Sequence, residues 1–136
     1  MSADCVFCRI SSGQDPSTTL LFENERLVAF RDIRPAAPTH LLVVPKQHIR
    51  DATLLDSTHS ALVHEMNEVA LKLLADHSLD GQDARIGFHW PPLVMIKHLH
   101  LHVIAPASQM SFLGRWLFWD KSPLFSPIAW MLDKLA

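Results

Sequence analysis

Three histidines at alternate positions, in the segment KHLHLHVI at residues 97–104, constrain the fold of this chain more than any other feature. Successive side chains of an extended strand point to opposite faces, so His98, His100 and His102 share one face and the residues between them share the other. We therefore predict a strand at residues 98–104 whose apolar face packs on a core while its histidine face lines a site. At about 3.3 Å per residue, the outer two Cα atoms lie about 13 Å apart, too far for all three rings to bind one metal ion, so we expect them to have different roles.

Length and composition indicate one globular domain. The chain has 136 residues, 49% of them apolar, which is enough for a hydrophobic core. The formal net charge is −2 and the 12 Lys and Arg residues are scattered, so no nucleic-acid partner is expected. No run approaches the roughly 20 apolar residues of a membrane span, and the first residues, MSADCVFC, do not resemble a secretory signal. We expect a location in the cytoplasm, with the nucleus as a second compartment.

The remaining pattern predicts an α+β fold. The expected elements are, in chain order, a short helix at 5–12, a strand hairpin at 18–22 and 26–30, a strand at 40–44, a long helix from about 57 to 76, a strand at 84–89 and the histidine strand. Because these elements follow each other without βαβ units, we predict an antiparallel sheet of about five strands with one long helix and a short N-terminal helix.

The last thirty residues are read separately from the rest. We place the domain core at 1–106 and treat 107–136 as an apolar C-terminal extension, which holds three of the four tryptophans. We predict short helices that pack on the core or on a dimer partner. An exposed patch for another protein or a membrane surface is the alternative.

The histidine segment resembles the signature of the histidine triad (HIT) superfamily of nucleotide-binding hydrolases, in which three histidines alternate with apolar residues. The segments CVFCRI and LVAFRDIRPAAPTHLLVVPKQHI resemble the Hint branch in order and spacing, so the resemblance covers about residues 5–106. The tail and the segment GFHWPP resemble the third Hint subgroup. The resemblance implies a HIT-like fold and a homodimer with the long helix and central strands near its twofold axis.

The same resemblance implies a role for each catalytic histidine. His100, the middle member, would attack the α-phosphorus of an adenylate and carry a nucleotidyl intermediate that water hydrolyses. His102 would donate to the phosphate oxygens, and His40 would help to protonate the departing amine. Transferase relatives carry glutamine at the position of His102, so hydrolysis is favoured. His98 would brace the strand.

Nucleotide-binding residues are also implied by the resemblance. Asp32 matches a carboxylate that accepts both ribose hydroxyls, with a loop cap as the alternative role. His89 stands where the founding subgroup has asparagine. The apolar wall around adenine is matched by Val6, Phe7, Ile10, Phe30 and Ile33. Plain core packing is the alternative for each of these apolar residues.

Cys5 and Cys8 form a Cys-x-x-Cys pair, which in a reducing compartment indicates metal or redox chemistry rather than a disulfide. Alone the pair is a weak signal, because a tetrahedral site needs four ligands. The family resemblance implies the other two, since several members complete a structural zinc site with residues matching His48 and His98. Without a metal, His98 would hold the site through backbone hydrogen bonds. No organic cofactor is expected.

These residues predict a phosphoramidase that hydrolyses purine nucleoside monophosphate conjugates such as adenylated lysine and aminoacyl adenylates. The alternative is a nucleotide-binding interaction module with little catalysis, because Met95 stands where the family often has serine or threonine, and Lys97 is unexpected beside the triad. Hydrolysis of dinucleoside polyphosphates or of DNA adenylates is less favoured by the Hint-like segments. For His59, His64 and His77 we expect solvated positions on or just past the long helix.

Overall fold

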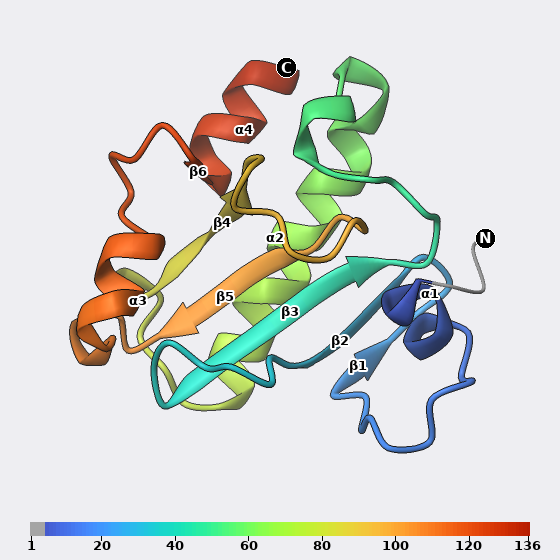
Figure 1. Ribbon diagram of the computed structural model, residues 1–136, viewed down its shortest axis with the longest axis horizontal. Helices are drawn as coiled ribbons and strands as arrows, with labels where there is room; N and C mark the ends of the chain where they lie inside the picture. The colour runs from blue at the N-terminus through green and yellow to red at the C-terminus, as the bar shows by residue number, and fades with distance from the viewer. Residues whose placement is uncertain (1–4) are drawn as a thin grey trace.

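The computed structural model describes residues 5–136, which fold around one antiparallel sheet (Figure 1). The sheet has six strands in the order β1-β2-β3-β5-β4-β6. The strands are β1 (Phe22–Glu23), β2 (Leu27–Arg31), β3 (Thr39–Pro45), β4 (Arg85–His89), β5 (Leu101–Ala105) and β6 (Phe125–Pro127). The helices are α1 (Val6–Ser11), α2 (Ser60–Asp76), α3 (Phe112–Leu117) and α4 (Ile128–Leu135). The predicted α+β class is confirmed, with one strand more than expected.

The strand alternation divides the apolar side chains between the two faces of the sheet. On one face, Leu41 and Leu101 belong to the main core, which α2 and α4 cover from behind the sheet in Figure 1. On the opposite face, Leu42 lies in a smaller cluster with α1, and Ile104 lies in another with the residues around α3. Between these two clusters the second face carries histidines, so this is where a site can form.

The long helix forms where the apolar periodicity predicted it. Its buried residues, Val63, Met66, Val69, Ala70, Leu73 and Leu74, are spaced three and four apart. The helix begins at Ser60 because the preceding turn, Ser57–His59, is a 3₁₀ helix capped by the side chain of Asp56. None of the helices in the described part of the chain is both long and apolar enough to cross a membrane.

The histidine strand is shorter than predicted, since β5 begins at Leu101 and not at His98. The reason is a change of hydrogen-bond partner. The N–H of Leu99 donates to the carbonyl oxygen of Ile49, at 2.6 Å, instead of to strand β3. The first two histidines therefore lie in a loop that leads into β5, and only His102 lies within the strand.

The C-terminal residues complete both faces of the sheet. Strand β6 pairs with β4 and becomes the sixth strand, and α4 buries Ile128, Met131 and Leu135 in the core beside α2. Helix α3 lies on the opposite face, at the end of the sheet away from α1 (Figure 1). Several apolar side chains of this region stay exposed, among them Phe112, Trp116 and Trp119.

Candidate active site

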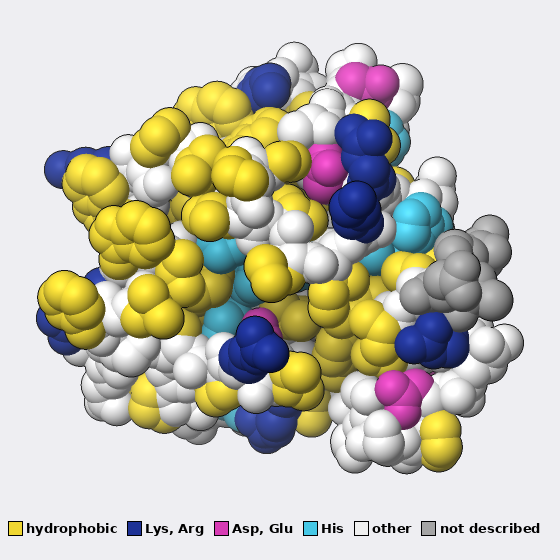
Figure 2. Space-filling view, in the orientation of Figure 1, with side chains coloured by type: hydrophobic (Ala, Val, Ile, Leu, Met, Phe, Trp, Pro, Cys, Tyr) yellow, Lys and Arg dark blue, Asp and Glu magenta, His cyan; other side chains and the backbone are white. Residues whose placement is uncertain are grey.

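The site is a hollow on the face of the sheet between the cluster at α1 and the cluster at α3. Figure 2 shows histidine side chains at the bottom of this hollow, with hydrophobic surfaces on both sides. His40 of β3 and His102 of β5 are 3% and 6% exposed, and His100 is half-buried. Strand pairing sets His40 opposite Ile104 and His102 opposite Leu42, which brings the two rings together on one face.

The hydrogen bonds of His40 and His102 fix which ring nitrogens carry protons. The backbone N–H of Ala36 donates to Nδ1 of His40, at 3.0 Å, so the proton of the neutral ring is on Nε2. That Nε2–H donates to Nδ1 of His102, at 2.9 Å. Consequently His102 carries its own proton on Nε2, the nitrogen that is not used inside the pair.

His100 has the opposite arrangement. Its Nδ1–H donates to the backbone carbonyl oxygen of His98, at 2.7 Å, so its Nε2 has a free lone pair. The ring lies between Phe7 and His102, with centroid distances of 5.2 Å and 4.9 Å. A lone pair on His100 thus lies next to an N–H donor on His102, an arrangement suited to nucleophilic attack on a group whose oxygens need a donor.

Burial keeps the histidines of the hollow neutral. It lowers the pKa of His40 to about 4, although the nearby carboxylate of Asp32 acts in the other direction. Burial also lowers the pKa of His100 and of His89, and the pKa of His102 is lowered well below its usual value by burial and by the neighbouring histidines. Neutral rings at pH 7 are required for the tautomers described above, and a neutral imidazole is the nucleophilic form.

His98 faces away from this hollow, toward the cysteines. Its Nε2–H donates to the carbonyl oxygen of Pro45, at 2.7 Å, which leaves the lone pair on Nδ1. That Nδ1 lies 3.3 Å from Sγ of Cys5, 3.4 Å from Sγ of Cys8 and 3.2 Å from Nδ1 of His48. The two sulfurs come together because Cys5 caps helix α1 and Cys8 lies in its first turn.

The spacing of these four donors fits a tetrahedral metal ion. In a regular tetrahedron the edge is 1.63 times the distance from centre to corner, so zinc bonds of about 2.1 Å to nitrogen correspond to edges of about 3.4 Å. All four donor atoms, from Cys5, Cys8, His48 and His98, lie within 4.8 Å of one another. The predicted donor set is therefore brought together in the part of the chain that the structure describes, with a tautomer of His98 that suits it.

A second group, Asp32, His40 and His102, is equally compact but does not suit a metal. Nε2 of His40 lies 3.4 Å from Oδ2 of Asp32, and it holds the proton because the N–H of Ala36 occupies Nδ1. A metal on Nε2 would have to displace this proton. The group is therefore a hydrogen-bonded pair of histidines with a carboxylate beside it rather than a ligand set.

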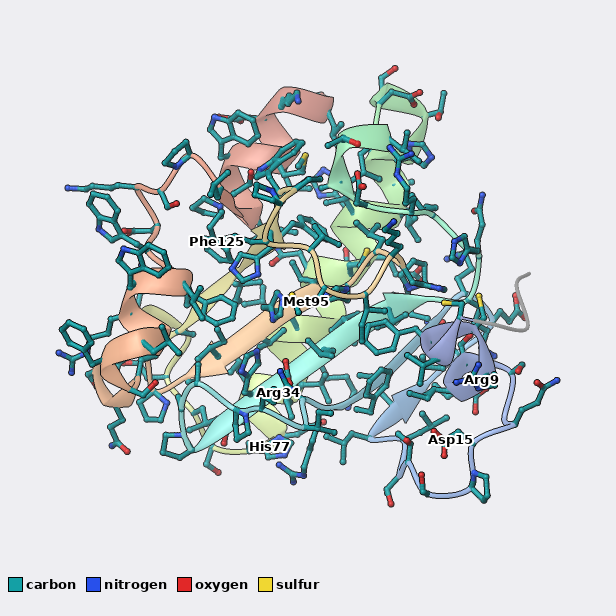
Figure 3. The ribbon with its side chains drawn as sticks, viewed as in Figure 1. Arg9, Asp15, Arg34, His77, Met95 and Phe125 are labelled. Carbon is teal, nitrogen blue, oxygen red and sulfur yellow. The ribbon has the colours of Figure 1, made fainter. Side chains whose placement is uncertain are left out.

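Asp32 serves the loop and the hollow at the same time. Its Oδ1 accepts the backbone N–H of Arg34, at 2.8 Å, as a loop cap does, while Oδ2 faces the rings of His40 and His102. The side chain is 18% exposed, so a ligand can reach it. Figure 3 shows Arg34 and Met95 in front of the central strands, over the hollow.

Most of the predicted apolar wall comes together beside His100. Phe7, Ile10 and Phe30 are buried in the cluster at α1, and Val6 packs against it. Ile33 does not join them, because it lies in the loop after β2 and is 90% exposed. Sequence reasoning missed Val28, Leu42 and Val44, which complete this cluster. Alternation would have identified them, because Val28 lies two residues before Phe30, and Leu42 and Val44 lie two and four residues after His40 on the same face of their strand.

His89 lies at the other end of the hollow, not in the apolar wall. Its Nε2–H donates to the carbonyl oxygen of Leu117, at 2.7 Å, and its ring is 5.0 Å from that of His102. A small open depression beside it is lined by His89, Arg50 and His100, among other residues. Met95 is 83% exposed, and Lys97 is also exposed.

Comparison with known proteins finds relatives of similar sequence and fold. A family model described as "Scavenger mRNA decapping enzyme C-term binding" matches residues 4–117. A protein of Xenopus tropicalis named adenosine 5'-monophosphoramidase HINT3 is 43% identical over 132 residues, which cover 96% of this chain and 86% of the relative. The protein of the same name from Mus musculus is 44% identical over 135 residues, covering 98% of this chain and 82% of the relative. A solved HIT family hydrolase from Legionella pneumophila is 36% identical, with a TM-score of 0.73 and coverage of 80% of this chain and 97% of its own.

Proposed function

This chain belongs to the histidine triad family, and we propose that it hydrolyses the P–N bond of adenosine 5′-monophosphoramidates such as adenylated lysine. Aminoacyl adenylates, in which the bond that breaks is the P–O bond of a mixed anhydride, are a second candidate class of substrate. One observation carries the proposal. A ring lone pair on His100 lies beside a ring N–H on His102, and backbone contacts set both tautomers. The names of the 43% and 44% identical relatives support the same activity.

In the first step, Nε2 of His100 attacks the α-phosphorus and forms an N–P bond. The P–N bond to the leaving amine breaks, and its electron pair goes to the amine nitrogen. The Nε2–H of His102 stabilises the charge on the phosphoryl oxygens. The anionic substrate favours binding of one proton by the pair of His40 and His102, and this proton passes to the departing amine.

In the second step, water attacks the phosphorus of the nucleotidyl-histidine. The bond to His100 breaks, and its electron pair returns to Nε2. The proton lost by the water goes to the pair of His40 and His102. When AMP leaves, the pair releases this proton to solvent and returns to its neutral starting state. Dividing one displacement into two lowers each barrier.

The nucleoside is proposed to lie between this centre and helix α1. Phe7 and Phe30 offer an apolar wall for the base, and Oδ2 of Asp32 is free to accept ribose hydroxyls, since Oδ1 already caps the loop. We propose the same nucleotide-facing position for Val6 and Ile10.

We also propose that Cys5, Cys8, His48 and His98 hold a zinc ion. Such an ion would be structural, because four protein ligands leave no open position for a substrate. The residues tie helix α1 to the loop before β5, and the bond from His98 to Pro45 orients the ligand ring. His98 is therefore proposed as a bracing residue rather than as part of the reaction.

The activity is tested with a fluorogenic AMP-amine phosphoramidate. Replacing His100 by alanine should abolish release of the amine, because no other lone pair occupies that position. His64→Ala is the matched control, since His64 is exposed on α2, away from the hollow. Intact mass after rapid quenching should show one adenylyl group on the wild-type chain and none on His100→Ala. Turnover retained by His100→Ala would refute the assignment.

A second function, nucleotide binding with little turnover, is favoured by Met95. This side chain is 83% exposed, and thioether sulfur cannot donate a hydrogen bond to a leaving amine. Measurement of phosphoramidate turnover by a protein that binds AMP distinguishes the two functions. Binding of AMP without turnover of any phosphoramidate supports the second, and multiple turnovers exclude it.

We propose that the protein is a homodimer in the cytoplasm and the nucleus. Exposed apolar side chains such as Leu71 of α2 and Trp116 of α3 are surfaces that a second copy would cover. Light scattering at several protein concentrations should give twice the chain mass. Imaging of the tagged protein tests the location, and a monomer or a secreted protein would contradict these proposals.

A further inference from the structure

Helix α3 ends against the histidine rings of the hollow. Phe118 follows the helix as its C-cap, is 6% exposed, and contacts three histidine rings. Its ring centroid lies 4.5 Å from that of His89, 4.8 Å from that of His102 and 5.3 Å from that of His40. The His89 ring stacks on it at 24°, and the other two meet it at 62° and 86°. Offset-stacked and edge-to-face arrangements are the favourable ones for aromatic rings.

The start of α3 is hydrogen-bonded to Ala36, the residue whose N–H sets the tautomer of His40. The N–H of Ser111 donates to the carbonyl oxygen of Ala36, at 2.9 Å, while the N–H of Ala36 donates to Nδ1 of His40, at 3.0 Å. Gly114 allows the close approach, since a Cβ there would lie 2.9 Å from Cβ of Ala36 and 3.2 Å from its carbonyl oxygen. The segment 111–118 therefore contacts the histidines directly at its end, through Phe118, and indirectly at its start, through Ala36.

The end of α3 also orients a ring from another strand. The carbonyl oxygen of Leu117, next to Phe118, accepts the Nε2–H of His89 at 2.7 Å, and this bond holds the His89 ring parallel to that of Phe118. Phe125 of β6, labelled in Figure 3, contacts both rings, with its centroid 5.8 Å from that of Phe118 and 5.5 Å from that of His89. Phe118, His89 and Phe125 thus form one group of mutually contacting rings, and Phe118 joins this group to His40 and His102.

We propose that Phe118 is a positioning residue of the active site. It holds the rings of His40 and His102 in the relative orientation that their shared hydrogen bond requires. The expected effect on kcat rests on the proposed function, whereas the expected effect on the orientation of the histidine rings rests on the ring contacts alone. It makes the C-terminal segment 111–118 part of the catalytic unit, although none of its side chains belongs to the triad.

The test compares two buried side chains of the same apolar cluster. Phe118→Ala removes the ring that contacts the histidines, whereas Met110→Ala removes a side chain that is 5% exposed in that cluster. We expect Phe118→Ala to lower kcat at least about tenfold with KM changed less than about threefold, because the nucleotide wall is untouched and only the reacting geometry loosens. Met110→Ala should change kcat less than about twofold.

A spectroscopic readout separates this inference from the proposed function. Ring nitrogen NMR spectra report the tautomers of His40, His102 and His89 whether or not the protein turns over a phosphoramidate. Phe118→Ala should shift these signals and Met110→Ala should leave them in place. Unaltered signals together with equal kcat values for the two variants would overturn the inference. If Phe118→Ala does not fold, Phe118→Leu is judged by the same criteria.

Should the wild-type protein lack phosphoramidase activity, the proposed function fails, and the ring signals alone decide this inference. Shifts seen only in the Phe118 variant then support the positioning role, and their absence refutes it.

Discussion

Acidification is expected to destabilise the protein through His40. The ring is 3% exposed, and burial lowers its pKa from 6.5 to about 4. Because the folded-state pKa lies below the unfolded-state value, the unfolded chain binds this proton first as the pH falls. The stabilising contribution is therefore complete above pH 6.5 and is lost as the pH falls toward 4.

The magnitude follows from the difference between the two pKa values. Lowering the pKa of His40 from 6.5 to about 4 corresponds to about 3 kcal/mol, at roughly 1.36 kcal/mol per pH unit. At pH 4.5 about 2.5 kcal/mol of this is already lost. His102 acts in the same direction, because burial and the neighbouring histidines lower its pKa as well.

Urea unfolding of the wild type and of His40→Gln at pH 7.5 and pH 4.5 measures this contribution. Glutamine keeps an acceptor for Ala36 and a donor for His102, but it does not titrate. Between the two pH values the wild type should lose about 2.5 kcal/mol more unfolding free energy than the variant. His64→Gln, at an exposed position, should lose as much as the wild type. Equal losses for the wild type and His40→Gln would refute the reasoning.

Three further outcomes are expected. A strong chelator, or Cys8→Ser, should lower the thermal unfolding midpoint by at least about 4 °C, the shift that roughly 1 kcal/mol causes in a chain of this size; an unchanged midpoint in both experiments excludes a structural metal. Gly87→Ala places a Cβ in steric overlap with the carbonyl oxygen of Ser126 in β6, so urea unfolding should show a loss of about 1–3 kcal/mol, and a negligible loss would contradict this close approach. Met95→Ser supplies a hydroxyl donor over the hollow and should raise kcat about threefold in steady-state assays; an unchanged kcat would show that residue 95 does not act on the leaving group.

Local patterns were sufficient for the elements that carry the site. The sequence pattern predicted strands at the places of β3, β4 and β5, alternation predicted the apolar face of the histidine strand, and three-four spacing predicted α2. The errors lie at the ends of elements, where the hydrogen-bond partner of the backbone determines whether a residue belongs to the strand. Residues 98–100 do not join β5, because the N–H of Leu99 finds the carbonyl oxygen of Ile49 instead of strand β3.

Which residues far apart in the chain form one site could be predicted only from the family resemblance, and it was tested only by the fold. The four donors of the Cys5 cluster were proposed together only because the resemblance paired them, and the fold then brought their atoms within 4.8 Å. Ile33 matched the same family pattern but is 90% exposed and is not among the residues packed in the apolar cluster. A family pattern names residue types at positions, whereas the path of a loop depends on its own packing.

The amino-acid sequence by itself determined which side chains share a face, because alternation within a strand and spacing within a helix are properties of the local backbone. It therefore specified a histidine face beside an apolar one. Only the tertiary structure decided which nitrogen of each ring carries the proton, since this depends on backbone groups of Ala36, Pro45 and His98 that the fold brings to the rings. It also decided that Phe118 of the tail lies against those rings, a contact that no local pattern contains.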